Sequence, residues 1–134
     1  MAKKTFNTSG KRKTAIARAT IKEGKGRVRI NSKPIEIYEP AIAKAKIQEP
    51  LSLFPKLVSK LDINIKVKGG GVMGQADAVR TAIARGILEF NQDEKVKGEL
   101  LAYDPHMLAD DPRRKEPKKQ LGRGARKKRQ KSYR

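Results

Sequence analysis

The sequence predicts an α+β fold with two layers, built in the order β-β-β-α-β-α and followed by a long basic C-terminal tail. Four segments alternate apolar and polar residues, as strands of a half-covered sheet do. One longer segment repeats apolar residues at helical spacing. Apolar residues nearly stop after Pro112, where cations take over. We therefore expect a single two-layer domain over residues 1–112 and an extended basic tail over residues 113–134.

The four predicted strands are residues 14–21, 27–31, 34–38 and 61–68. In the last of these, "LDINIKVK", every second residue is Leu, Ile or Val, and the residues between them are polar. The connections "KEGKG" and "NSK" are short enough for hairpin turns. The first three strands are therefore predicted to form an antiparallel meander.

Two helices are predicted to cover the apolar face of this sheet. The first spans residues 40–49, begins with a proline and ends before Pro50, because proline fits a first helical turn but not an interior one. The second spans residues 75–90, with Gly86 allowing a close approach to the sheet. Its apolar stripe consists of Ala76, Val79, Ile83, Ile87 and Phe90. Residues 91–112 are ambiguous, and "EKVKGELLA" is compatible with a further short helix.

The charge of the chain indicates its class of partner. Lys and Arg number 33 against 14 Asp and Glu, and residues 113–134 alone carry a net charge of +11. Such a surface attracts polyanions, either nucleic acid or an anionic membrane. Membrane docking needs bulky apolar anchors beside the charges, and the tail has none. With no secretory signal and no apolar run of about 20 residues, the chain is expected to be cytosolic, with no membrane partner.

A glycine-rich segment lies between the fourth strand and the second helix. Gly69, Gly71 and Gly74 spell G-x-G-x-x-G, a pattern found in nucleotide-binding loops. A phosphate-binding P-loop needs Lys and then Ser or Thr after its last glycine, and Gln75 and Ala76 stand there instead. The P-loop interpretation is therefore rejected.

Two other specific interpretations of this loop also fail. A dinucleotide fold needs a buried parallel strand, whereas Lys66 and Lys68 leave one face of this strand wet. The G-x-x-G loop of KH domains joins two helices, and here a strand comes first. Two general interpretations remain open: a tight strand-to-helix turn, or an anion site at the start of the helix that takes an RNA phosphate.

The chain lacks the residues that catalysis would need. It has no cysteine, and its one histidine, His106, is interpreted as an ordinary surface or packing residue. Asp110 and Asp111 are adjacent, so they cannot face each other across a substrate. They are interpreted as turning the chain before Pro112. We expect no enzymatic activity, no metal and no cofactor.

Four stretches together resemble one family closely. They are "GKRKTAIARATI", "KVKGGGVMGQADAVRTAIARGI", "DPRRKEPKK" and "GRGARKKRQKSYR". The family is that of the ninth protein of the small ribosomal subunit, and the closing "KSYR" is more similar to its archaeal and eukaryotic branch. The resemblance implies a fold like domain 2 of ribosomal protein S5, with a left-handed βαβ crossover against the usual right-handed rule. It also implies a place in the head of the subunit, among neighbouring ribosomal proteins.

The resemblance further implies which residues touch RNA. The tip of the tail is expected to approach the anticodon stem-loop of the peptidyl-site tRNA through Lys131, Ser132, Tyr133 and Arg134. The residues expected to bind small-subunit rRNA lie in the first motif, around the glycines and along the tail: Lys11, Arg12, Lys13, Lys66, Lys68, Gly69, Gly70, Gly71, Gly74, Arg113, Arg114, Lys115, Lys118, Lys119, Arg123 and Arg126. Because the chain has few aromatic residues, these contacts should go mainly to phosphate and sugar.

Overall fold

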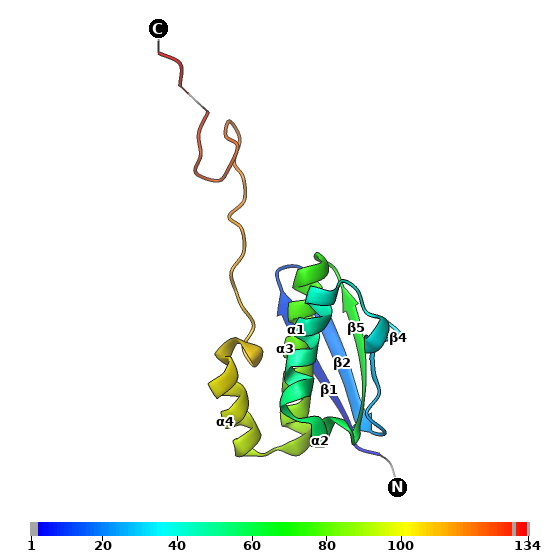
Figure 1. Ribbon diagram of the computed structural model, residues 1–134. Helices are drawn as coiled ribbons and strands as arrows, with labels where there is room; N and C mark the ends of the chain where they lie inside the picture. Colours follow the sequence, from blue (N-terminus) through cyan, green and yellow to red (C-terminus); the bar gives the residue numbers. More distant parts are fainter. Residues whose placement is uncertain (1–2, 130, 134) are drawn as a thin grey trace.

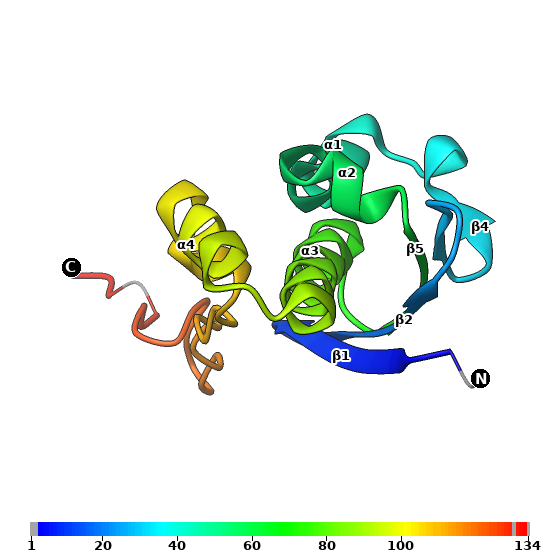
Figure 2. The ribbon, with the colours of Figure 1, turned by 90° about the horizontal axis from the view of Figure 1, so that it is seen from below.

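The computed structural model describes residues 3–129 and 131–133. A five-stranded mixed sheet is covered by helices on one face, and the tail runs out from the core as an extended chain (Figures 1 and 2). The strand order is β1-β2-β5-β3-β4, with every neighbouring pair antiparallel except β3 and β5. The strands are β1 (Thr5–Arg12), β2 (Ala15–Glu23), β3 (Val28–Ile30), β4 (Lys33–Pro34) and β5 (Leu61–Lys68).

The central helix, α3, crosses β1 and β2, and α1 lies beside it over the other half of the sheet (Figure 2). The helices are α1 (Ala41–Leu53), α2 (Pro55–Val58), α3 (Val72–Asn91) and α4 (Glu94–Tyr103). Two 3-10 turns, η1 (Ile35–Ile37) and η2 (Pro105–Met107), precede α1 and follow α4. Met107 is fully buried, so η2 is held against the core from which the tail departs.

The core forms between the covered face of the sheet and the stripe of α3. Apart from Glu23 at the end of β2, the alternating residues of β2 and β5 that point toward the helices are buried, as the period-two pattern predicts. On β2 three of them are alanines, which brings α3 near the sheet. Gly10 of β1 and Gly86 of α3 bring the layers closer still. A methyl group at Gly10 would collide with the Ala78 carbonyl, and one at Gly86 with the side chain of Ile21.

The predicted meander is wrong, although the layer arrangement is confirmed. β2 and β3 do not form a hairpin, because β5 lies between them, antiparallel to β2 and parallel to β3. This order places β5, whose apolar residues are all buried, at the centre of the sheet. The strand over residues 5–12 is missing from the predicted order. The hairpin through "NSK" is confirmed as β3–β4.

Two predicted boundaries are also wrong. Residues 34–38 do not form a strand: β4 ends at Pro34, η1 follows, and Ile37 is 62% exposed. Pro34 has no N–H to donate to a further ladder, which favours the end of the strand there. α1 continues past Pro50 to Leu53, and the Pro50 ring is fully buried. Burial of that apolar ring offsets the missing backbone hydrogen bond. The short helix in "EKVKGELLA" is confirmed as α4.

Candidate nucleic-acid interface

Three segments that are distant in sequence meet at one end of the sheet. They are the β1–β2 turn with Lys11–Lys13, the segment Lys68–Gly74 from the end of β5 into the first turn of α3, and the root of the tail with Arg113 and Arg114. A Cβ placed on Gly74 would lie 3.5 Å from the Arg12 carbonyl, and Arg114 Nη2 donates to the Lys13 carbonyl at 2.9 Å. We call this group of residues the cationic end. It lies on the side of the core from which the tail departs (Figure 1).

The glycines of the strand-to-helix turn do not share one role. Gly69 and Gly70 have φ of +78° and +67°, which residues with a Cβ rarely adopt. A Cβ on Gly70 would also lie 2.9 Å from the Ala15 Cβ, so both glycines fit the turn tightly against the start of β2. Gly71 has φ of −95° and nothing within 4 Å of its Cβ position. The turn geometry therefore accounts for Gly69 and Gly70, but it does not account for Gly71.

The start of α3 can receive an anion. Gly71 is its N-cap and supplies no capping side chain, and the first bond back to it comes from Gln75 N at 2.9 Å. The backbone N–H groups of Val72, Met73 and Gly74 therefore precede the first bond of the helix. Both Val72 and Met73 are exposed. Free N–H groups and the helix dipole together favour a phosphate at this position.

The root of the tail is tied to β1 by two adjacent carboxylates. Asp110 Oδ1 accepts the Lys11 backbone N–H at 3.0 Å, and its other oxygen lies 3.4 Å from Arg85 Nη2. Asp111 forms an isolated parallel bridge with Arg12 and accepts the Arg113 backbone N–H at 3.0 Å. The hydrogen bond from Arg113 to Asp111 spans Pro112 and forms a local side-chain turn, which confirms the predicted role of Asp111 in turning the chain.

The side chain of Arg12, predicted to bind RNA, also helps to attach the root of the tail to β1. Arg12 Nη1 donates to the Arg113 carbonyl at 2.7 Å, and Arg12 Nη2 lies 3.7 Å from Asp111 Oδ2. Hydrogen bonds from the Arg113 guanidinium and backbone hold the pKa of Asp111 well below its usual range. The Arg113 side chain is nevertheless 83% exposed, against 17% for Arg12. Arg113 therefore keeps an open surface for a phosphate, whereas Arg12 mainly holds the root.

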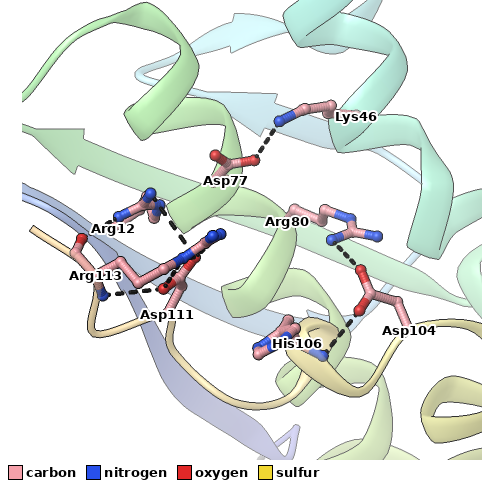
Figure 3. A network of polar contacts seen from close by, with 8 residues as sticks. All are labelled: Arg12, Lys46, Asp77, Arg80, Asp104, His106, Asp111 and Arg113. Atoms are coloured by element: carbon pink, nitrogen blue, oxygen red, sulfur yellow. Dashed lines mark hydrogen bonds and ion pairs between the residues drawn. The ribbon is translucent and has the colours of Figure 1, made fainter.

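A second group of ion pairs joins the helices beside the root (Figure 3). Arg80 of α3 pairs with Glu49 of α1 and, at 2.9 Å, with Asp104 at the end of α4. Burial would raise the pKa of Asp104, but hydrogen bonds from the His106 backbone and from Arg80 outweigh it and lower that pKa. His106 itself is exposed, as an ordinary surface residue is expected to be. Because Arg80 is paired with a carboxylate of α1 and with one at the end of α4, we interpret these ion pairs as structural.

The rest of the tail carries its cations away from the core (Figure 1). The exposed residues of this part include Lys115, Lys118, Lys119, Arg123, Arg126, Lys131, Ser132 and Tyr133. A short loop closes where Arg129 N donates to the Leu121 carbonyl at 3.1 Å. Arg126 also pairs with Glu116 at 3.0 Å, on an exposed surface. Arg134, the last of the predicted tip residues, lies outside the described residues.

Lys66 and Lys68 lie on the same, uncovered face of the sheet, two positions apart on β5. Lys68 adjoins Gly69 and belongs to the cationic end. Lys66 lies opposite Arg18 in the register of β5 and β2, on the uncovered face of the sheet. The cationic end therefore collects Lys11–Lys13, Lys68–Gly74 and the first tail arginines, but not Lys66 or the later tail residues.

Sequence reasoning missed Arg85, and it missed the contacts that Asp110 makes with Lys11 and Arg85. Arg85 of α3 donates from Nη1 to the Ser9 carbonyl at 2.7 Å and from Nε to the Leu108 carbonyl at 2.8 Å. It thereby joins β1 to the segment before the tail, together with Asp110. The only signal for Arg85 is a cation within the otherwise apolar residues 82–87, and the contact of Asp110 with Lys11 crosses 99 positions of sequence.

Comparison with known proteins decides the family. Residues 10–134 match the model of the family described as Ribosomal protein S9/S16. The chain is also 58% identical over 131 residues to a protein named small ribosomal subunit protein uS9, from Methanothrix thermoacetophila. That alignment covers 98% of this chain and 99% of the relative. The chain belongs to the ribosomal protein S9/S16 family.

Membership in the S9/S16 family indicates whether the chain is an enzyme. The family consists of structural, non-enzymatic proteins, so the chain is not an enzyme. Within residues 3–129 and 131–133 the structure contains no cluster of three metal-ligating side chains. No helix in that part of the chain has the length and apolar character to cross a membrane.

Proposed function

We propose that this chain is a structural constituent of the small ribosomal subunit that binds rRNA through its cationic end and its tail. Family membership is the observation that carries the proposal, and the similarity to a protein named small ribosomal subunit protein uS9 supports it. The net charge of +19 and the three segments that converge at the cationic end suit a polyanion. The protein then works in the cytoplasm as part of the subunit, with rRNA and neighbouring ribosomal proteins as partners.

Within this role, the cationic end and the tail are each proposed to make their own contacts with rRNA. In the cationic end, Lys11, Lys13 and Lys68 are proposed to bind phosphates near the start of α3, where a phosphate can lie against Gly71 and the first free N–H groups. Lys66 adds a contact from the uncovered face of the sheet. The tail cations bind phosphates along its length: Arg113, Arg114, Lys115, Lys118, Lys119, Arg123 and Arg126. Such contacts position the protein on folded RNA without reading its sequence.

The tip of the tail is proposed to reach the peptidyl-site tRNA. From Pro112 to Arg134 an extended chain spans on the order of 70 Å, at about 3.3 Å per residue. This is far enough to leave the binding site of the core in the subunit head. Ser132 and Tyr133 supply hydroxyl groups, and Arg134 supplies a planar fork for a phosphate. These groups, with Lys131, suit the backbone of an anticodon stem-loop.

The finer description of the fold is also a proposal. β3, α1 and β5 form a parallel βαβ unit, and this unit is where the handedness of the crossover is defined. We assign it the left-handed crossover of the domain 2 fold of ribosomal protein S5. The family resemblance supports this assignment, against the general right-handed rule.

Two truncations test the proposed function. Removing residues 132–134 should leave incorporation into the subunit nearly intact and weaken peptidyl-site tRNA binding by about 1–3 kcal/mol, the value of a few charge-assisted hydrogen bonds. Removing residues 113–134 should also impair incorporation. The measurements are co-sedimentation with reconstituted subunits and tRNA affinity on those subunits. The full-length double variant K95Q/K97Q, altered on exposed positions of α4, is the matched control.

The outcomes separate the parts of the proposal. Failure of the full-length chain to join the small subunit would overturn the ribosomal role itself. Unchanged tRNA affinity after removal of residues 132–134, combined with failed assembly, would make the tip an anchor on rRNA instead of a tRNA contact.

A further inference from the structure

The sheet has a second face that no described helix covers (Figure 2). Its outward residues come from β1, β2, β5 and β3, and they are polar at nearly every position. The register brings them together in cross-strand rows. Ser9, Arg18 and Lys66 form one row, and the row of Asn7 and Thr20 continues through Asn64 to Arg29. This face is defined here as the open face.

The cations of the open face are not neutralised by the protein. Among the described residues, Arg18, Arg29 and Lys66 have no acidic partner within 4 Å. Asp62 is the acidic residue of β5 on this face, and it accepts the backbone N–H groups of Lys25 and Arg27 at 2.9 and 3.1 Å. These hydrogen bonds lower the pKa of Asp62 and tie its carboxylate to a turn. The open face therefore presents uncompensated positive charge.

The two rows also line a shallow hollow of about 750 Å³ on the open face. Arg18, Arg29 and Lys66 stand around it, with Asn7, Asn64 and Ser32 between them. Thr20 Oγ1 donates to Asn7 Oδ1 at 3.1 Å, which leaves the Asn7 amide N–H groups to donate elsewhere. Cations beside amide and hydroxyl groups match the two features of an RNA backbone, its phosphates and its 2′-hydroxyls.

We propose that the open face is a second RNA-binding surface, which takes a sugar–phosphate backbone across the rows of β1, β2, β5 and β3. Arg18, Arg29 and Lys66 bind phosphates, and Asn7 and Asn64 bind sugar hydroxyls. The one aromatic residue of β1, Phe6, faces the helices and packs on Phe90 at 5.8 Å. Base stacking is therefore not part of this surface. The inference rests on the proposed rRNA binding and adds the rows of Arg18, Lys66 and Arg29, which lie next to Lys11 and Lys68 of the cationic end on the same face of the sheet.

The double variant R18Q/R29Q tests this inference in the full-length chain. Both side chains are exposed and lie outside the cationic end, so the variant should fold normally in a thermal melt. Its affinity for small-subunit rRNA should fall roughly tenfold at 0.1 M salt. Its salt slope should drop by about 1.5, since each lost phosphate contact removes about 0.7–0.9. K95Q/K97Q removes the same charge from α4 and should leave both quantities unchanged.

The results distinguish this inference from the proposed function. If R18Q/R29Q binds like the wild type while deletion of residues 113–134 weakens binding, the open face is not an RNA surface and the proposed function stands. If the wild type itself does not bind rRNA, both fail. If R18Q/R29Q and K95Q/K97Q lose affinity equally, only overall charge matters and the inference is overturned.

A tethered probe locates the contact directly. The chain has no cysteine, so Ser32→Cys at the edge of the hollow can carry a single photocrosslinker. In assembled subunits it should crosslink to rRNA. Crosslinking to a neighbouring protein instead would overturn the proposal and make the open face a protein-docking surface.

Discussion

The core and the tail are held by different interactions. In the core, apolar residues of β2, β5 and α3 are buried, and the polar side chains that join its helices have partners within the protein. In the tail beyond Pro112, nearly every residue is exposed and most ionic groups are cations with no acidic neighbour. The two regions meet at Asp110 and Asp111, where hydrogen bonds and ion pairs replace apolar packing.

This difference indicates how the two regions depend on RNA. Burial of apolar surface stabilises the core whether or not a partner is bound. The tail lacks the apolar surface that would offset its ordering entropy, so its order should depend on contacts with a polyanion. We therefore propose that the core serves as the folded platform and that the tail becomes ordered on RNA.

The largest effect should come from the contact between the two layers of the core. Gly10→Ala would push a methyl group into the backbone of α3, at Ala78 O and within 2.9 Å of Ala82 N, and backbone cannot turn aside as a side chain can. We expect a loss of about 3 kcal/mol in the free energy of unfolding, measured by denaturant titration. Gly98→Ala is the control, since its added Cβ meets nothing within 4 Å, and it should stabilise α4 by about 0.5–1 kcal/mol. Equal effects from both would contradict the close packing of β1 on α3.

A smaller difference should separate Gly70 from Gly71. Gly70→Ala should lower the free energy of unfolding by about 1–2 kcal/mol, because a Cβ is strained at its positive φ and crowds Ala15. Gly71→Ala should change it by less than about 0.5 kcal/mol. If Gly71 meets a phosphate, Gly71→Val should weaken rRNA binding at unchanged stability. Normal rRNA binding by Gly71→Val would reduce the glycine turn to a purely structural role.

The smallest expected effect is the loss of stability at low pH. The pKa values of Asp104 and Asp111 are lowered in the folded protein, so their stabilisation is complete above the unfolded value of about 3.9 and is lost as pH falls through the folded values. The free energy contributed by these carboxylates should therefore stay level from pH 7 to 5 and decline only below about pH 4. Denaturant titrations of the wild type and Asp104→Asn check this. The wild type should lose more stability below pH 4 than the variant, and equal losses would contradict the role of Asp104.

The sequence was most informative where alternation alone determines burial. The patterns in residues 14–21, 27–31 and 61–68 predicted strands, and the stripe of α3 predicted a helix, because these elements bury one face each. β1 escaped detection because its covered positions include Thr8 and Gly10, which allow close contact with α3 and carry little hydrophobic signal. The order of the strands was predicted wrongly as a meander, since turn length does not fix which strands pair.

The candidate site was likewise predicted from the sequence only in part. Its cations and glycines were visible as motifs, since charge and backbone freedom belong to single residues. The attachment of the tail root was not, because Asp110 meets Lys11 and Arg85 only after folding. The prediction for residues 34–38 failed for a related reason: alternation is also compatible with a 3-10 turn that leaves Ile37 exposed.

Amide hydrogen exchange over residues 113–129 tests directly whether the tail becomes ordered only on RNA. It compares the free protein with the protein in assembled small subunits, and the strands β2 and β5 serve as the internal reference. The account predicts slow exchange in β2 and β5 in both states, with tail exchange that is fast in the free protein and slow in the subunit. Slow tail exchange without RNA, or fast tail exchange in the subunit, would contradict a tail that becomes ordered on RNA.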